Sequence, residues 1–339
     1  TLLLNASFID NLGLMHGKMG IAIYFFHLAR ETENQIYEDY AGELIDEIYD
    51  EIDTNTPLDF ENGLGGIGWG IEYLVQKGFI EADTDKVLES IDNQLHSSRN
   101  YISGIGLLNG LVGLGYYYLK RIQNVNSTEN KVSTLLNKQM LVHLIDELEL
   151  RIEKAESLNL INSTDAFNLL WNYSVLISFL GEVYQLNLFN FKVERMIQYL
   201  ITPLYRSENI PEQHSKRLQL GLALKQLQQY RPDQTLIAFM EELIQELTTK
   251  LKRETILNEL TPESAFLING TSGIAWIYQQ LFLFTNNEYF RKEYLYWNSH
   301  DFGLIETDTG YAGFFVTKEN ANTAFGLLNG IAGINIMLL

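Results

Sequence analysis

The chain contains no cysteine among its 339 residues. Disulfide bonds, thiolate nucleophiles and thiolate metal ligands are therefore excluded from its chemistry. Prolines are also few, five in all, which favours long uninterrupted secondary structure. The sequence has no run of eighteen or more apolar residues, so we expect no membrane span.

Positive charge is scarce as well. The chain has 24 Lys and Arg residues and 43 Asp and Glu residues, so its net charge is −19. The basic residues form no cluster or stripe. Nucleic acid and anionic membrane surfaces would repel such a chain, so both are excluded as partners. A basic or neutral partner fits the charge better, although the charge also serves simply to keep a large protein in solution. We expect a cytoplasmic protein.

Apolar residues, in contrast, are abundant. They make up 46% of the chain, which is enough for a large core and excludes a disordered protein. The length exceeds that of most domains, but closed helical barrels reach this size, so we predict one domain over residues 1–339.

Five short segments share one pattern, in which Asn or His precedes Gly-x-x-Gly and an apolar stretch follows. Their first glycines are Gly17, Gly63, Gly110, Gly270 and Gly330. The first three lie 46 and 47 positions apart, and the gap between positions 110 and 270 leaves room for further copies. We place two degenerate copies there, at residues 171–174 and 218–221, which gives about seven units.

Each unit pairs an almost wholly apolar stretch with an amphipathic one. The apolar stretches lack the alternation of a strand, so they are interpreted as buried helices rather than as parts of β-hairpins. Amphipathic helices are predicted at residues 37–52, 132–152, 191–204 and 235–251. We therefore predict an all-α protein, an α/α toroid (barrel) of about seven helical hairpins, with an inner and an outer ring of helices. Closure is favoured over an open solenoid because the first and last units keep the full motif.

The glycines suggest both a packing role and a functional one. Two glycines three positions apart allow buried helices to approach closely, and they would also expose backbone N–H groups at the helix starts. If all buried helices start at one end, the residue before each first glycine lines a common mouth. Those residues are His16, Asn62, Asn109, Asn269 and Asn329.

This array resembles the lanthionine synthetase C-like family over nearly the whole chain. In active bacterial members, zinc is bound by the cysteine of a Trp-Cys-Tyr-Gly motif and by a later Cys-His pair, and it activates a substrate thiolate. Residues 171–174, read as Trp-Asn-Tyr-Ser, look like the first motif with Asn172 in the cysteine position. Ile268 and Asn269 look like the Cys-His pair. Residues 216–221 are the other candidate for the first motif, and they too lack a thiolate, so the resemblance predicts a protein without zinc or another cofactor.

The family also uses an aspartate before the second glycine motif and a histidine in the third. Asp59 fits the first position, and Asn109 replaces the histidine of the second. Asparagine does not exchange protons near neutral pH, whereas His16 does. Asp59 and His16 are therefore the catalytic candidates, with a capping loop residue and a hydrogen-bonding histidine as the structural alternatives. The candidates for substrate binding are Asn62, Asn109, Trp171, Asn172, Tyr173, Asn269 and Asn329.

Three functions follow from this pattern. The leading hypothesis is a cyclase-deficient protein of peptide modification, a pseudoenzyme that binds a peptide at the mouth or assists a peptide-modifying enzyme. The second is a carbohydrate-active toroid enzyme with paired carboxylates, and the third is a non-catalytic scaffold. The carboxylate candidates are Asp59, Glu61, Asp165, Asp301, Glu306 and Asp308. Residues 298–324 are interpreted as a loop over the mouth or an ordinary insertion, and whether the protein is an enzyme and how it oligomerises stay open.

Overall fold

The computed structural model describes residues 3, 6–97, 104–123, 132–154, 166–260, 265–305, 325–330 and 332–333, with only the backbone described at 7, 207 and 300–305. Within these ranges the regular structure is helical, and one isolated β-bridge joins Gly104 to Gly110. None of the described helices is both long and apolar enough to cross a bilayer.

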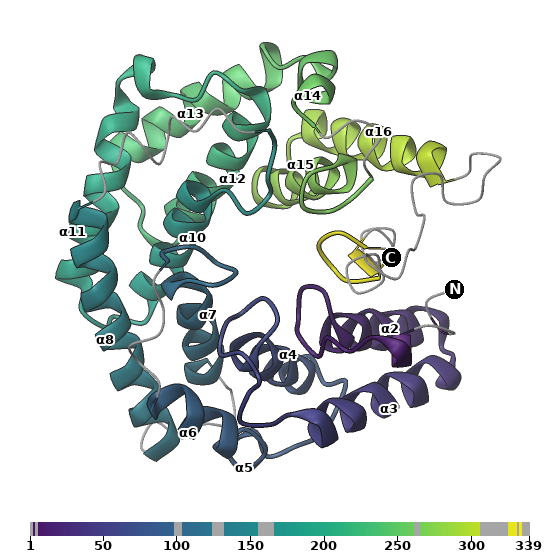
Figure 1. The fold of residues 1–339 in the computed structure, drawn as a ribbon. Coiled ribbons are helices and arrows are strands. Elements are labelled where there is room, and N and C mark those ends of the chain that lie inside the picture. Colours follow the sequence, from purple (N-terminus) through teal and green to yellow (C-terminus); the bar gives the residue numbers. More distant parts are fainter. Residues whose placement is uncertain are drawn as a thin grey trace. The chain divides into compact units, whose positions relative to one another are not determined.

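The chain forms two compact units (Figure 1). The first comprises residues 1–144 and 315–339, and the second comprises residues 145–314. The first unit contains η1 (Ala6–Phe8), α2 (Lys18–Thr32), α3 (Gln35–Glu51), α4 (Leu64–Gln76), α5 (Thr84–Val87), α6 (Glu89–Ser97), α7 (Leu111–Ile122) and the beginning of α8 (Val132–Lys154). This grouping does not test the prediction of a single domain, which stays a prediction.

The second unit begins within α8 and continues through three helical hairpins. Its elements are α10 (Asn172–Gln185), α11 (Asn190–Ile201), η3 (Thr202–Tyr205), η4 (Ser207–Asn209), α12 (His214–Tyr230), α13 (Gln234–Thr249), α14 (Arg253–Glu259), α15 (Thr271–Thr285) and α16 (Glu288–Ile305). The amphipathic helices predicted from the sequence correspond to α3, α8, α11 and α13, which confirms their positions to within a few residues.

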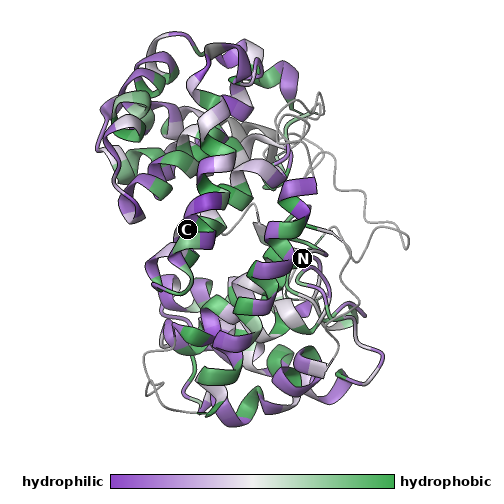
Figure 2. Cartoon of the chain, turned by 90° about the vertical axis from the view of Figure 1, so that its left-hand side faces the viewer, coloured by the Kyte–Doolittle hydropathy of each residue, from purple (hydrophilic) through white to green (hydrophobic). Residues whose placement is uncertain are grey.

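The α2–α3 hairpin shows why each pair folds as it does. Helix α2 is buried along most of its length, whereas α3 buries Ala41, Leu44, Ile45 and Ile48, which share one face at helical spacing. Asn34 starts α3 by accepting a hydrogen bond from the backbone N–H of Ile36. Figure 2 shows hydrophilic and hydrophobic residues mixed along many single helices, as such amphipathic packing requires.

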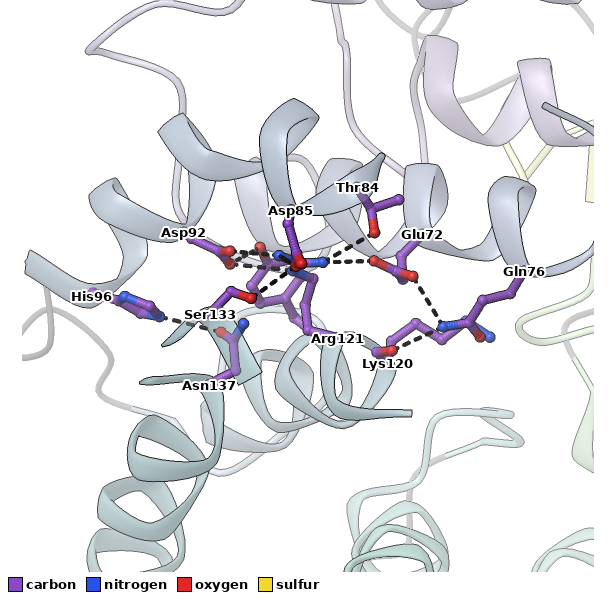
Figure 3. A network of polar contacts seen from close by, with 11 residues as sticks. Glu72, Gln76, Thr84, Asp85, Asp92, His96, Lys120, Arg121, Ser133 and Asn137 are labelled. Carbon is purple, nitrogen blue, oxygen red and sulfur yellow. Dashed lines mark hydrogen bonds and ion pairs between the residues drawn. The ribbon is translucent and has the colours of Figure 1, made fainter. Parts of the chain in front are cut away.

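A buried polar network anchors α5 and α6 to α4 and α7 in the first unit (Figure 3). The guanidinium of Arg121 on α7 lies 2.9 Å from Glu72 of α4 and 2.8 Å from Asp92 of α6. It also pairs with Asp85 at 3.3 Å, and Tyr117 donates its hydroxyl hydrogen to Asp92. Hydrogen bonds to these carboxylates outweigh the cost of burial and hold the pKa of Arg121 above its usual value. The network is structural, since it joins four helices and Arg121, Glu72 and Asp92 are buried.

Two details of the sequence-based prediction are corrected here. The fifth unit was expected to start at residues 218–221, but α12 starts at His214, so Gly221 lies two turns inside the helix. A Cβ atom there would lie 2.7 Å from the side chain of Leu247 on α13, so this glycine permits helix packing and marks no helix start. Residues 298–305 belong to α16 and are not part of a loop, and residues 306–324 lie outside the described residues.

Candidate functional site

In four of the five glycine motifs, the preceding loop folds back onto the residues that follow the first glycine. The first two N–H groups of α2, on Lys18 and Met19, donate to carbonyls seven positions earlier, on Asn11 and Leu12, at 2.8 and 3.2 Å. The same seven-position bonds occur before α4, before α7 and in the last motif. They join Leu64 to Pro57, Gly65 to Leu58, Leu111 to Gly104, Val112 to Ile105, Ala332 to Phe325 and Gly333 to Gly326. The loops therefore satisfy N–H groups that a helix start otherwise leaves unpaired.

This fold-back explains the glycines. The first glycine is the N-cap residue of α2, α4, α7 and α15, and its φ near −120° is open to any amino acid, so space rather than backbone conformation requires glycine. A Cβ atom on Gly66 would lie 2.2 Å from the carbonyl oxygen of Phe60, and one on Gly113 would lie 2.0 Å from that of Leu107. The second glycine thus lets the loop pass across the first turn of the helix.

The fold-back also overturns one expectation. The glycines were expected to expose backbone N–H groups at the helix starts. Carbonyl groups of the loops instead accept hydrogen bonds from the first of these N–H groups in α2, α4 and α7. A ligand at this end of the first unit must therefore be recognised mainly by side chains and by the remaining polar groups of the loops.

Four glycine loops of the first unit lie side by side, and we call residues 11–17, 57–63, 104–110 and 325–330 the loop layer. Leu327 and Leu328 donate their N–H groups to the carbonyl of Met15, at 2.9 and 3.2 Å. Met15 donates to the carbonyl of Glu61 at 2.9 Å, and Glu61 donates to that of Leu108 at 3.0 Å. The first and last glycine motifs of the chain are therefore in direct contact.

Two glycines outside the predicted motif allow the first loop to approach its two neighbours, the second loop at Gly13 and the last loop at Gly326. A Cβ atom on Gly13 would lie 2.3 Å from the Cα atom of Asn62, and one on Gly326 would lie 2.6 Å from that of His16. Both glycines stand four positions before a first glycine, and so does Gly106. Aligning the repeats at this position reveals the shared signal, which the search for Gly-x-x-Gly alone missed.

His16 and Glu61 form a hydrogen-bonded dyad between the first and second loops. The Nε2 atom of His16 lies 3.0 Å from Oε1 of Glu61. The imidazole is nine-tenths buried, whereas the carboxylate of Glu61 is 23% exposed. Because a carboxylate accepts hydrogen bonds, Glu61 orients the ring with Nε2 protonated.

Asp59 and Asn62 shape the second loop. Asp59 accepts a hydrogen bond from the backbone N–H of Asn62 at 2.7 Å and so stabilises the loop before α4, whereas the start of α4 itself has no side-chain cap. The Oδ1 atom of Asn62 accepts from the side-chain amide of Asn11 at 2.6 Å. Both predicted site residues thus lie in the loop layer, together with His16. Of the other two predicted there, Asn109 is exposed and Asn329 is half-buried.

The second unit contains the other predicted binding residues. Asn172 is exposed at the first position of α10, and Trp171 before it is buried. Tyr173 is fully buried and donates its hydroxyl hydrogen to the carbonyl of Leu200, so it packs α10 on α11 and is not accessible to a ligand. Asn269 is half-buried and directly precedes the N-cap Gly270 of α15.

Helix α12 starts differently from the glycine-motif helices. Its first two N–H groups, on His214 and Ser215, each donate at 2.8 Å to the carboxylate of Glu259. A negative charge at this position also complements the helix dipole. Lys216 occupies the place of the second glycine, is buried, and has its ammonium 5.6 Å from the ring centre of Trp171.

The residues at the family's zinc positions do not suit a zinc ion. Zinc in proteins is bound by thiolate, imidazole and carboxylate groups. Asn172 and Asn269 offer only neutral amides, and Ile268 offers no donor atom. By helix register, His214 is the counterpart of Asn172 in the next unit, but its Nδ1 accepts a hydrogen bond from the N–H of Lys252 at 3.2 Å. The described residues contain no group of three or more His, Cys, Asp or Glu side chains that could hold a metal ion.

The other carboxylate candidates fall only partly within the described residues. Asp59 and Glu61 already bind Asn62 and His16. The side chain of Asp301 is not described, and Asp165, Glu306 and Asp308 lie outside the described residues.

Comparison with known proteins agrees with this structure. A sequence model of the family described as lanthionine synthetase C-like protein matches residues 9–166. The fold is similar to the solved structure of nisin cyclase, with a TM-score of 0.69 and 14% sequence identity, over 97% of this chain and 88% of that one. No curated protein matches the sequence. The predicted resemblance to the lanthionine synthetase C-like family and the predicted all-α, α/α-toroid fold are thus confirmed.

Proposed function

We propose that this lanthionine synthetase C-like chain binds a peptide at its loop layer and takes part in peptide modification without catalysing zinc-dependent cyclisation. The alignment of four loops carries this proposal. Backbone hydrogen bonds hold the loops side by side, and each presents a polar residue directly before its first glycine. Those residues are His16, Asn62, Asn109 and Asn329.

The side chains in the loop layer suit an extended peptide. Amide groups both donate and accept hydrogen bonds, as the backbone of an extended peptide does. Asp59 and Glu61 supply negative charge, and the chain as a whole carries −19, which favours a neutral or basic peptide over an acidic one. In the second unit, the exposed Asn172 and the half-buried Asn269 are proposed separately as peptide-binding residues.

The absence of zinc-binding side chains supports the loss of cyclisation. A substrate thiol is a weak nucleophile at neutral pH unless its pKa is lowered, and zinc ligation is what lowers it in the family. Asn172, Ile268 and Asn269 cannot replace the thiolates and the imidazole that would hold the ion. The dyad of His16 and Glu61, with Asp59 beside it, is the proposed location of any proton transfer that this chain retains.

Peptide binding is tested by isothermal titration calorimetry with candidate precursor peptides. We expect micromolar binding that Asn109→Ala weakens about tenfold, since a lost interfacial hydrogen bond costs on the order of 1–1.5 kcal/mol. Asn93→Ala, at an exposed asparagine of α6, is the matched control and is expected to bind normally. Absence of binding at high micromolar concentration would count against the proposal and favour a scaffold.

The loss of zinc chemistry is tested separately by metal analysis of the purified protein. We expect far less than one zinc ion per chain, and no acceleration of thiol addition to a dehydrated peptide when zinc is added. Stoichiometric zinc would contradict the assignment of Asn172, Ile268 and Asn269 and leave the question of peptide binding untouched.

A further inference from the structure

The junction of the first, second and last glycine loops holds three polar side chains. Met15 lies at its centre, because its carbonyl accepts from Leu327 and Leu328 and its N–H donates to Glu61. His16 and Asn329 are the next residues along the two loops that meet at the bond between Leu328 and Met15. The side chain of His16 also contacts that of Glu61, so the backbone and this contact bring the three residues to one junction.

Two atoms of this junction are buried without a hydrogen-bond partner in the described part of the chain. They are Nδ1 of His16 and Oδ1 of Asn329. Protein interiors rarely leave such atoms unpaired, because desolvation without a replacement hydrogen bond costs free energy. The side chain of His16 is only 10% exposed, so its unpaired nitrogen is not simply a surface group in bulk water.

Both unpaired atoms are hydrogen-bond acceptors. Glu61 accepts from the ring of His16 at Nε2, and this leaves Nδ1 of the neutral imidazole with a lone pair. The amide oxygen of Asn329 also accepts only. The second carboxylate oxygen of Glu61 adds a third acceptor and a negative charge. A hydrogen-bond donor with positive charge is therefore the complementary ligand.

The neighbouring lysine of this chain does not provide that donor. Lys18 lies within the first glycine motif, directly after Gly17, but its ammonium lies 2.9 Å from Glu47 and 2.7 Å from Glu51, both on α3. These hydrogen bonds hold the pKa of Lys18 above its usual value despite desolvation by burial, which acts in the opposite direction. Lys18 is thus committed to joining α2 to α3.

We propose that His16, Glu61 and Asn329 form a subsite for a primary ammonium group of the bound peptide. An ammonium group has three N–H donors and one positive charge, which match three acceptors and one carboxylate. The ammonium comes from a lysine side chain or from the free amino terminus of the peptide. This inference rests on the proposed function and names the chemical group that the loop layer recognises.

The subsite is tested by NMR on uniformly ¹⁵N-labelled protein, with the imidazole signals of His16 identified by their loss in His16→Gln. One probe is N-acetyl-lysine N-methylamide, which has only a side-chain ammonium. The other is glycine N-methylamide, which has only an amino-terminal one. We expect a saturable shift of the His16 Nδ1 signal with at least one probe, and the stronger probe identifies the source of the ammonium.

Three comparisons decide the outcome. Acetylation of the lysine side chain should abolish the shift caused by the lysine probe, and Glu61→Gln should weaken ammonium binding at least tenfold. Glu89→Gln, which removes the same charge from an exposed position of α6, should bind normally. The inference is overturned if neither ammonium probe moves the His16 signal, if the acetylated probe binds equally well, or if N-acetyl-arginine N-methylamide binds more tightly.

Acetylation also separates this inference from the proposed function. If a precursor peptide binds equally well after all its amino groups are acetylated, the ammonium subsite is wrong while peptide binding stands. If no precursor peptide binds but the ammonium probes do, the subsite stands and the peptide function fails. The comparison with acetylated probes needs no variant, so it remains decisive even if Glu61→Gln lowers stability.

Discussion

Leu328, close to the end of the chain, donates its backbone N–H to the carbonyl oxygen of Met15, close to the beginning, at 3.2 Å. The neighbouring N–H of Leu327 binds the same oxygen at 2.9 Å. The first compact unit therefore requires both ends of the chain. Contacts so distant in sequence carry a large loop-closure entropy, so we expect this junction to form late in folding.

We expect one added methyl group, at Gly326, to open the junction between the first and last loops. Gly326→Ala places a Cβ atom 2.6 Å from both the carbonyl oxygen of Met15 and the Cα atom of His16, so the last loop must move away from the first. We expect faster hydrogen exchange at the amides of Leu327 and Leu328, measured by mass spectrometry. Gly42→Ala is the control, because nothing lies within 4 Å of a Cβ atom there. Unchanged exchange in Gly326→Ala would contradict the described contact.

Substitution of a motif glycine should destabilise the protein strongly. In Gly66→Ala, the added carbon would lie 2.2 Å from the carbonyl oxygen of Phe60, so the loop or the helix must shift. We expect a loss of about 2–3 kcal/mol in the free energy of unfolding, measured by urea denaturation. Gly42→Ala, inside α3, should raise it by about 0.5–1 kcal/mol. Equal effects of the two substitutions would argue against the fold-back.

Removal of Arg121 should be among the most costly single changes in the first unit. Arg121→Met leaves the carboxylates of Glu72 and Asp92 buried without their cation, and the expected loss is about 3–5 kcal/mol. Lys86→Met breaks only an exposed pair with Asp83 and should cost about 0–1 kcal/mol. Denaturation of both variants in urea provides the comparison, and a small effect at Arg121 would show that the network is dispensable.

Acid should weaken the α11–α13 region of the second unit. The hydrogen bond from Arg231 lowers the pKa of Glu194 below its usual value of 4.5, and the backbone N–H of Leu236 lowers the pKa of Asp233 below 3.8. A lowered carboxyl pKa contributes stability above the unfolded-state pKa, and that contribution is lost as the pH falls through the folded-state value. We expect Glu194→Gln to flatten the dependence of stability on pH below about pH 4.5. An unchanged acid slope would rule out this contribution.

Much of the fold follows directly from the repeated sequence pattern. Gly17, Gly63, Gly110 and Gly270 are the N-cap residues of α2, α4, α7 and α15, as the motif predicts. Apolar stretches then have no alternative to burial, and amphipathic stretches have only one apolar face to bury. These are local properties, which a single sequence displays in full.

The fold-back of the loops was not predicted, because it depends on backbone atoms that have no sequence signature. Every residue has a carbonyl group, so nothing in the sequence marks the carbonyl of Pro57 as the acceptor for the N–H of Leu64. The start of α12 at His214 was missed for a related reason. Glu259, a distant carboxylate, supplies the cap there, and no glycine pair marks the position.

The candidate site was predicted in part. His16 was recognised as a titratable residue before a glycine motif, and Glu61 was considered only as a member of a carboxylate pair. Their contact joins two consecutive repeats. His16 stands directly before the first glycine of its repeat, as Asn62 does in the next repeat, and Glu61 stands one residue before Asn62. Side-chain direction decides such a contact, and the repeat period alone does not reveal it.

Because of the seven-position hydrogen bonds, the glycine loops before α2, α4 and α7 each form one local structural unit with the first turn of the following helix. Its internal bonds run from residue to residue within one stretch of about ten, and the same bonds recur in three consecutive repeats. Evolution, or an engineer, can therefore exchange residues 57–66 with residues 104–113 and keep the local backbone intact, while altering only the side chains that the exchanged loop shows to its neighbours.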